Sequence, residues 1–259
     1  MQHNIKAVFF DIDGTLVSFK THCIPESTKK ALKLLREKGI RLFIATGRHK
    51  AFIDNLGDEQ FDAYITVNGQ LCLNEQTTIY RKAIDPNDII TLVNDMKRHE
   101  RSCIFVGEHD YFINHINQTA KEMMKLLNFP YVKIGTPIDA TKMPIYQIVA
   151  FVDKDEEEQF MQNLPHCSPT RWHNDFIDVV PQGGSKQVGI DKIIDFYRIP
   201  LSETLSFGDG ENDIPMLTHT AIGVAMGNGN ENVKNAATMI TDSVDEDGIY
   251  NALKRLEII

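Results

Sequence analysis

An apolar run near the N-terminus that stops on two carboxylates constrains the fold more than any other feature. Residues 6–15 read Lys-Ala-Val-Phe-Phe-Asp-Ile-Asp-Gly-Thr, with Asp11 and Asp13 two residues apart. A continuous Val/Phe run is typical of a central parallel strand, and ligands of parallel sheets bind outside the carboxyl ends of the strands. Gly14 lets the backbone leave the strand sharply. The segment predicts a buried strand that delivers two acids to a site, and an ordinary Asp-Gly turn is the alternative.

Length and charge narrow the class of protein. A chain of 259 residues with 42% hydrophobic and 24% charged residues is expected to form one large or two moderate globular domains. The net charge of -9 disfavours nucleic acid and anionic membranes as partners, because both reward basic patches. The four cysteines show no ligand spacing and no stretch of about 18 apolar residues occurs, so we expect a cytoplasmic protein with reduced thiols. We expect a monomer, because no feature of the sequence implies a protein partner.

Strands and helices alternate in the first 81 residues. The expected elements are a helix at 25–38, a strand at 40–45, a further helical stretch, a strand at 63–67 and hairpin strands at 71–73 and 78–80. This alternation is typical of an α/β fold with a doubly wound, Rossmann-like parallel sheet.

The pattern changes between residues 82 and 181. We expect a helix at 86–98, strands at 103–106 and 111–114, a helix at 118–127, a loop with Pro130 and Pro137, a strand at 146–152, an acidic helix from 155 and a hairpin at 170–180. Adjacent pairs of strands indicate an α+β domain with an antiparallel sheet. The alternation then returns, with helices at 185–197 and 214–217, strands at 204–207 and 221–225 and a closing helix. We therefore expect a parallel-sheet domain, residues 1–81 and 182–259, interrupted by an inserted domain, residues 82–181.

A second group of acids follows the strand at 204–207, where residues 208–213 read Gly-Asp-Gly-Glu-Asn-Asp. If Asp11, Asp13, Asp209 and Asp213 converge, their mutual repulsion raises their pKa values unless a cation lies between them. Oxygen ligands without histidine or thiolate select a hard ion, and Mg2+ typically binds through one or two carboxylates and a substrate phosphate. Mg2+ is the expected cofactor, and a solvated acidic loop is the alternative.

Two further elements suit an anionic ligand. Thr46 and Gly47 end the second strand and offer a hydroxyl and an accessible backbone N–H. Lys186 begins a predicted helix, where the helix dipole disfavours a cation unless an anion lies in front of it. A phosphate would account for both features, whereas an exposed lysine is the simpler alternative for Lys186 alone.

With these motifs in place, the chain resembles the haloacid dehalogenase superfamily of phosphohydrolases, in particular its Cof-type branch with a large cap domain. The resemblance covers the whole length. It rests on four motifs in order: DIDGT at 11–15, Thr46, Lys186 in GGSK, and GDGEND at 208–213. Each motif is weak alone, but four in order at strand ends are a strong signal. The insertion between the second and third motifs also matches, so residues 82–181 would be the cap.

The resemblance implies a mechanism. Asp11 would attack the phosphorus and form an aspartyl-phosphate, while Asp13 would act as general acid and then as general base. Mg2+ would be bound by Asp11, by the backbone carbonyl of Asp13 and by Asp209, and Asp213 would orient metal-bound waters or Lys186. The groups implied to hold the phosphate oxygens are Thr46, Gly47, Lys186, Asn212 and the backbone N–H of Ile12.

The resemblance also implies the substrate class, small phosphorylated metabolites such as sugar phosphates. A phosphomutase is the alternative within enzymes, because an aspartyl-phosphate can pass to a sugar hydroxyl. A non-hydrolytic phosphoacceptor module is disfavoured by the acid at Asp13 and by the long insertion. Arg171, His173, Asp175 and Asp178 of the predicted hairpin suit a cleft lining and an exposed hairpin face equally.

Overall fold

The chain folds around a large, mostly parallel sheet in a computed structural model that describes residues 4–126 and 132–259. The sheet order among these residues is β14-β13-β12-β1-β2-β3-β4-β5. The strands are β1 (Ala7–Phe10), β2 (Arg41–Ala45), β3 (Ala63–Thr66), β4 (Leu71–Leu73), β5 (Thr78–Arg81), β12 (Thr204–Gly208), β13 (Ile222–Ala225) and β14 (Met239–Ile240). β3 and β4 pair antiparallel, whereas the pairs from β14 to β3 are parallel. The predicted α/β fold is confirmed.

β1 lies in the middle of this sheet, between β12 and β2. Its four residues are fully buried, since Phe9 stacks on Phe43 on one face and Phe10 stacks on Phe207 on the other. Burial on both faces explains why the strand reads as a continuous apolar run instead of an alternating one. The carboxyl end of β1 is therefore a rigid platform for the residues that follow it.

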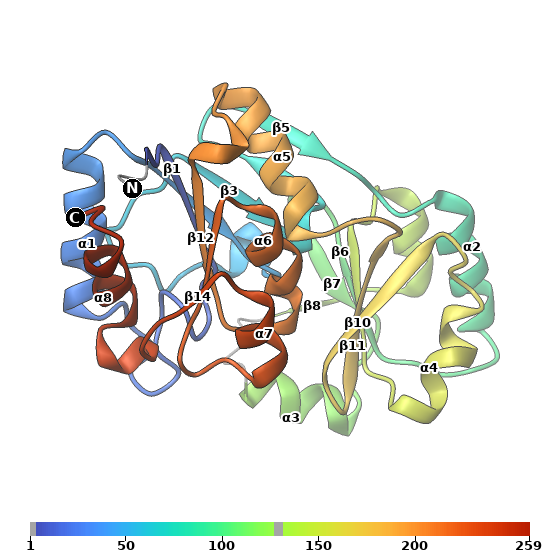
Figure 1. The fold of residues 1–259 in the computed structure, drawn as a ribbon. Helices are drawn as coiled ribbons and strands as arrows, with labels where there is room; N and C mark the ends of the chain where they lie inside the picture. The colour runs from blue at the N-terminus through green and yellow to red at the C-terminus, as the bar shows by residue number, and fades with distance from the viewer. Residues whose placement is uncertain (1–3, 127–131) are drawn as a thin grey trace. The chain divides into compact units, whose positions relative to one another are not determined.

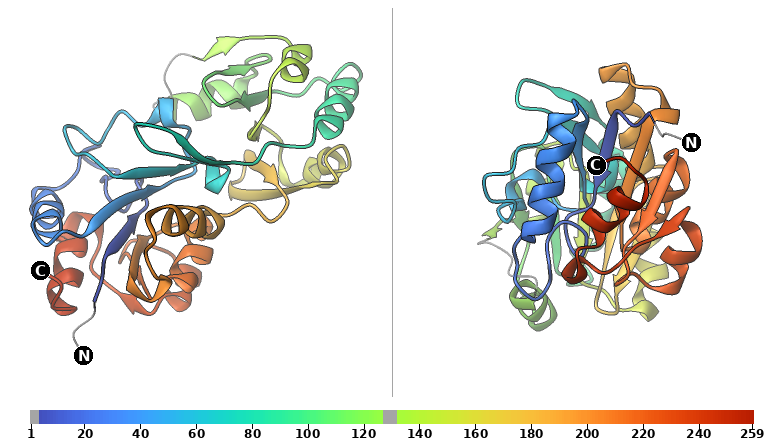
Figure 2. Two further views of the ribbon diagram at one scale, coloured as in Figure 1. Left: turned by 90° about the horizontal axis from the view of Figure 1, so that it is seen from above. Right: turned by 60° about the vertical axis from the view of Figure 1, so that its left-hand side comes forward.

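Helices cover both faces of the sheet (Figure 1). α1 (Glu26–Glu37) and α8 (Gly248–Arg255) lie side by side on one face, as Figure 2 also shows. α5 (Lys186–Tyr197), α6 (Ile214–His219) and α7 (Glu231–Ala236) cover the other face. Each layer forms its own apolar cluster with the sheet, as doubly wound folds require.

The segment between β2 and β3 differs from the prediction. We expect a helical stretch after residue 48, but the structure has only a single 3-10 turn, η1 (Lys50–Phe52). His49 Nδ1 accepts from Ala51 N, and the Arg48 guanidinium donates to the Phe52 carbonyl at 2.8 Å. These side chains satisfy the backbone groups of a tight turn, so the segment returns to the sheet without a full helix.

A second sheet of six strands among the described residues has the order β10-β11-β9-β6-β7-β8. Its strands are β6 (Cys103–Val106), β7 (Tyr111–Ile113), β8 (Lys133–Ile134), β9 (Gln147–Ala150), β10 (Cys167–His173) and β11 (Phe176–Pro181). The pairs are antiparallel except for β7 with β8. α2 (Pro86–Asp95) and α4 (Lys154–Met161) contribute to its separate apolar core, and α3 spans Gln118–Leu126. Asp85 caps α2 through Asn87 N, but the helix ends at Asp95 instead of residue 98.

The described residues divide into two compact units. The first comprises the residues up to Tyr80 together with Ser185–Ile259, and the second is Arg81–Gly184. The predicted helix end at Leu127 and the loop residue Pro130 lie outside the described residues. Among the described helices, none combines the length and the apolar character needed to cross a bilayer.

Candidate active site

Asp11 directly follows β1 and lies against a lysine from another part of the chain. Its backbone N–H donates to the Phe207 carbonyl at 3.0 Å, which anchors the residue to the neighbouring strand β12. Its carboxylate accepts from Lys186 Nζ at 2.6 Å. Only 7% of Asp11 is exposed. The first acid of the DIDGT motif is thus held at the carboxyl end of the central strand with a cation beside it.

Lys186 is fully buried at the first position of α5, where Ser185 caps the helix. Its ammonium group donates to Asp11 Oδ1 at 2.6 Å and to Asp213 Oδ1 at 2.5 Å. Burial by itself would lower the pKa of Lys186, but the charges of Asp11 and Asp213 outweigh it and raise the pKa above the usual value. The lysine therefore stays charged, and the alternative of an exposed lysine is wrong.

The loop after β12 contributes two carboxylates. Asp213 Oδ2 accepts from the backbone N–H groups of Asp209 and Gly210 at 3.0 and 2.9 Å, which closes the loop on itself. Asp209 Oδ1 accepts from the Thr15 hydroxyl at 2.9 Å. The carboxylates of Asp11, Asp209 and Asp213 place oxygen atoms within 4.8 Å of one another. Two strand ends far apart in sequence thus meet in one acidic cluster.

The charge balance of this cluster fits a dication. Burial raises the pKa of Asp11 well above its usual value, with Lys186 opposing the shift and Asp213, Asp209 and Asp13 adding to it. Burial also raises the pKa of Asp209 to about 7, with a further contribution from the charge of Asp213. When all three carboxylates are ionised, one ammonium leaves an excess of two negative charges among oxygen-only donors. A hard divalent ion would relieve that excess, so these residues fit the expected metal.

The Asp13 side chain points to a different partner. Its two carboxylate oxygens accept from Arg48 Nε and Nη2, each at 2.7 Å, in a bidentate pair. Asp13 does not belong to the acidic cluster formed by the described side chains, which is consistent with a part played by its backbone carbonyl alone in metal binding. Arg48 also donates to the Phe52 carbonyl, so the turn after β2 fixes the orientation of this ion pair.

The remaining predicted residues lie around the same end of the sheet. Thr46 follows β2 and is buried, and its hydroxyl accepts from Arg48 N at 3.1 Å. Ile12 is fully buried in the core, so only its backbone can face a ligand. Asn212 follows β12, and its side-chain amide donates to Asn68 Oδ1 at 3.1 Å. Gly47 lies beside the same Asn68 amide, since a Cβ added to it would be 3.2 Å from Asn68 Oδ1.

Two asparagines in this region were not predicted to belong to the site. Asn228, in the loop after β13, donates through Nδ2 to the Gly14 carbonyl at 2.9 Å and to Asp209 Oδ2 at 3.0 Å. Asn68 follows β3 and contacts the residues just described. The Asn68-Gly69 pair after the strand is a turn signal that could have drawn attention to this position, although it would not by itself assign the residue to the site.

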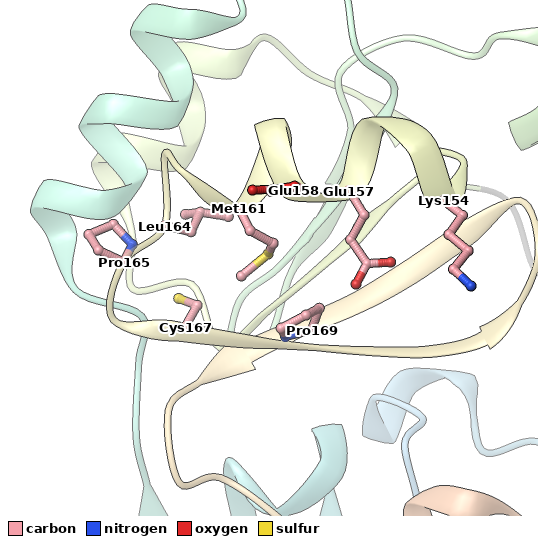
Figure 3. Close-up of a pocket in the computed structure, with 8 residues that line it drawn as sticks. All are labelled: Lys154, Glu157, Glu158, Met161, Leu164, Pro165, Cys167 and Pro169. Atoms are coloured by element: carbon pink, nitrogen blue, oxygen red, sulfur yellow. The ribbon is translucent and has the colours of Figure 1, made fainter.

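The second unit contains an open pocket of about 450 Å3 between α4 and β10 (Figure 3). It is lined by Lys154, Glu157, Glu158, Met161, Leu164, Pro165, Cys167 and Pro169. Burial raises the pKa of the Cys167 thiol to about 12, so this sulfur is not a nucleophile at neutral pH. None of the residues that line the pocket belongs to the acidic cluster.

One hairpin residue of this unit serves a local structural purpose. Arg171 pairs with Glu157 at 2.7 Å and donates to the carbonyls of Val152, Asp153, His173 and Asn174. Its guanidinium ties the hairpin to the start of α4. Asp178 is buried, whereas the carboxylate of Asp175 lies 3.5 Å from the ring of His173.

Comparisons with known proteins agree with this geometry. Residues 8–253 match the family model of haloacid dehalogenase-like hydrolases. "Putative phosphatase YkrA" of Bacillus subtilis (strain 168) is 34% identical, with 98% of each chain covered. The solved structure of the HAD subclass IIB sugar phosphatase BT4131 is 43% identical, with a TM-score of 0.91 over 98% of this chain and 100% of that one. A structure from work on a trigonal-bipyramidal intermediate in a phosphoryl-transfer superfamily matches at the same identity and coverage, with a TM-score of 0.92.

Proposed function

Because this chain belongs to the haloacid dehalogenase-like hydrolases, we propose that it is a Mg2+-dependent phosphatase of small phosphate monoesters that works through an aspartyl-phosphate. The observation that carries the proposal is the position of Asp11, buried at the end of the central strand between Lys186 and two further carboxylates. Sugar phosphates or related metabolites are the proposed substrates. The similarity to the sugar phosphatase BT4131 supports that class.

The proposed reaction has two steps with Asp11 as nucleophile. A carboxylate oxygen of Asp11 forms a bond to phosphorus while the bond from phosphorus to the leaving oxygen breaks. Asp13 gives a proton to that leaving oxygen. It then takes a proton from the water that attacks the aspartyl-phosphate, which releases inorganic phosphate and frees Asp11. The pair with Arg48 would hold the Asp13 carboxylate near the reacting atoms between these steps.

Asp11, Asp209 and the backbone carbonyl of Asp13 would hold the Mg2+, and Asp213 would orient Lys186. When bound, a divalent ion reduces the repulsion between an anionic nucleophile and an anionic substrate. The positive charge of Lys186, which contacts both Asp11 and Asp213, would act in the same sense.

The phosphate oxygens would be held by groups from several strand ends: Thr46, Gly47, Lys186, Asn212 and the backbone N–H of Ile12. Fixed donors of this kind stabilise the charge that spreads over the oxygens in the transition state. The bounds of the second unit, Arg81–Gly184, are close to those of the predicted insertion, residues 82–181. We further propose that this unit acts as a cap that contacts the leaving group and sets specificity.

Phosphate release from sugar phosphates, nucleotides and small phosphoesters, measured with Mg2+ and with EDTA, tests the proposal. Wild type should release phosphate only with the metal, and Asp13→Ala should lose at least about 100-fold in kcat because it removes the general acid. Asp11→Asn should abolish turnover, since no covalent intermediate can form. The matched control is Asp195→Asn on the exposed face of α5, which should keep full activity.

Three outcomes would count against the proposal. Turnover in Asp11→Asn at a rate comparable to wild type would remove the covalent mechanism. Transfer of the phosphoryl group to a second sugar hydroxyl would indicate a phosphomutase. Formation of a stable phosphoprotein without turnover would indicate a phosphoacceptor module.

A further inference from the structure

The turn after β3 adopts a backbone conformation that its residues disfavour. Val67, Asn68 and Gly69 have φ values of 54°, 51° and 92°. Glycine adopts positive φ without penalty, but a β-branched residue such as valine rarely does. Two consecutive non-glycine residues in this region persist only where the surroundings impose them, and such positions cluster at functional sites.

The contacts that impose this turn come from the proposed phosphate site. Val67 N donates to the Arg48 carbonyl and Asn68 N donates to the Thr46 carbonyl, both at 3.1 Å. On the other side, a Cβ on Gly69 would collide with the carbonyl of Ser185, the residue before Lys186. The turn is thus wedged between the loop after β2 and the start of α5.

The Asn68 side chain occupies the space between two proposed phosphate-binding groups. Only 6% of Asn68 is exposed. Its Oδ1 accepts from Asn212 Nδ2 at 3.1 Å, and its amide atoms lie 3.2 and 3.3 Å from the position of a Cβ on Gly47. Gly47 follows β2 and Asn212 follows β12, which flank β1 on opposite sides. Asn68, which follows β3, therefore links Asn212 and Gly47, which follow two other strands.

We propose that Asn68 is a positioning residue for phosphate binding, an inference that rests on the proposed function. Asn212 Nδ2 carries two N–H bonds, and donation of one to Asn68 fixes the direction of the other toward the phosphoryl group. The same amide sets the distance between Asn212 and the backbone of Gly47. Asparagine suits the position because it tolerates left-handed backbone and brings a polar amide on a short side chain. The strain of the turn is what holds this amide in place.

The test uses a substitution that removes the Asn68 amide and at the same time relieves the strain of the positive φ at this residue. Asn68→Gly should keep or raise the melting temperature, yet lower kcat/KM for a sugar phosphate by about 10- to 100-fold, because a small displacement of binding groups has that effect. Arg198→Gly is the matched control: Arg198 is exposed at the end of α5 with φ of 57°, so glycine relieves the same conformation away from the site. It should leave kcat/KM unchanged.

A double-mutant cycle with Asn212→Ala tests whether Asn68 acts through Asn212. If it does, Asn68→Gly should have little further effect in the Asn212→Ala background, whereas a merely structural role predicts that the two effects multiply. Undiminished kcat/KM in Asn68→Gly, or multiplied effects in the cycle, would overturn the proposal.

Binding separates this inference from the proposed function. Calorimetric titration with orthovanadate in the presence of Mg2+ should show weaker binding to Asn68→Gly than to wild type and to Arg198→Gly. A wild type that binds vanadate more tightly than Asn68→Gly but hydrolyses nothing would refute the phosphatase and leave the positioning role supported. Equal vanadate affinity in all three proteins would refute the positioning role, whatever the activity.

Discussion

Lys186 and its two carboxylate partners form a fully buried charge network at the residue scale. The ammonium group has no exposed surface and makes its two short contacts with Asp11 and Asp213. Removing a charge from water costs free energy, and opposite charges recover that cost only when both partners are present. We therefore expect the lysine to contribute to stability, in addition to its proposed part in binding phosphate.

We expect Lys186→Met to lower the free energy of unfolding by about 3–5 kcal/mol, because it leaves buried carboxylates without a counter-charge. Adding Asp213→Asn should restore part of that loss. Lys192→Met on the exposed side of α5 is the control; it loses a cation–π contact with Tyr80 at 5.4 Å and should change stability by less than about 1 kcal/mol. Urea unfolding followed by circular dichroism measures all three, and a Lys186→Met protein as stable as the control would contradict the account.

The turn that follows β1 shows how an element is fitted to the site. Gly14 has φ of 80°, and a Cβ there would collide with the Asp209 carboxylate and lie 2.7 Å from the Phe19 ring. Asn228 bridges the Gly14 carbonyl and Asp209, so the two strand-end loops are joined at this point. Glycine is required both by the backbone angle and by the space.

Gly14→Ala should therefore destabilise the protein more than Gly39→Ala does. Gly39 also has a positive φ, 74°, but nothing lies within 4 Å of its added Cβ, so it measures the backbone effect alone, about 1–2 kcal/mol. Displacement of Asp209 in Gly14→Ala should in addition weaken Mg2+ affinity, which Gly39→Ala should leave unchanged. Equal losses of stability in the two variants, with equal Mg2+ affinity by calorimetry, would show that the close approach has no consequence.

At the scale of the whole molecule, stability should be linked to pH and to metal through the acidic cluster. The pKa of Asp209 is raised to about 7 in the folded protein from 3.8, mainly by burial. Between these values the folded state binds more protons than the unfolded state, so the metal-free protein loses stability as pH rises toward 7. A divalent ion at the proposed site would bind the deprotonated form and reverse that loss.

Mg2+ should therefore raise the melting temperature more at about pH 8 than at about pH 6, where protons compete for the same oxygens. Thermal unfolding with Mg2+ and with EDTA at both values measures the difference. Asp209→Asn should abolish most of the metal effect at either pH. A larger stabilisation at the lower pH would contradict the assignment of Asp209 to the metal.

The sequence by itself determined the parallel-sheet core and the strand ends that carry Asp11 and Asp209. A central parallel strand buried on both faces reads as a continuous apolar run, and ligands of such sheets bind outside the carboxyl ends of the strands. This is why local patterns indicated the acids, the buried strands and the return of the chain to the first sheet after the insertion. The bidentate partner of Asp13, the Asn228 bridge and the strained turn at Asn68 were decided only by the tertiary structure. Each of these features depends on the distance between loops that follow different strands. The packing of the helices on the sheet sets that distance, and a local sequence pattern cannot predict it. The single 3-10 turn after β2 has the same origin, because side-chain bonds of His49 and Arg48 replaced the helix that spacing alone favoured.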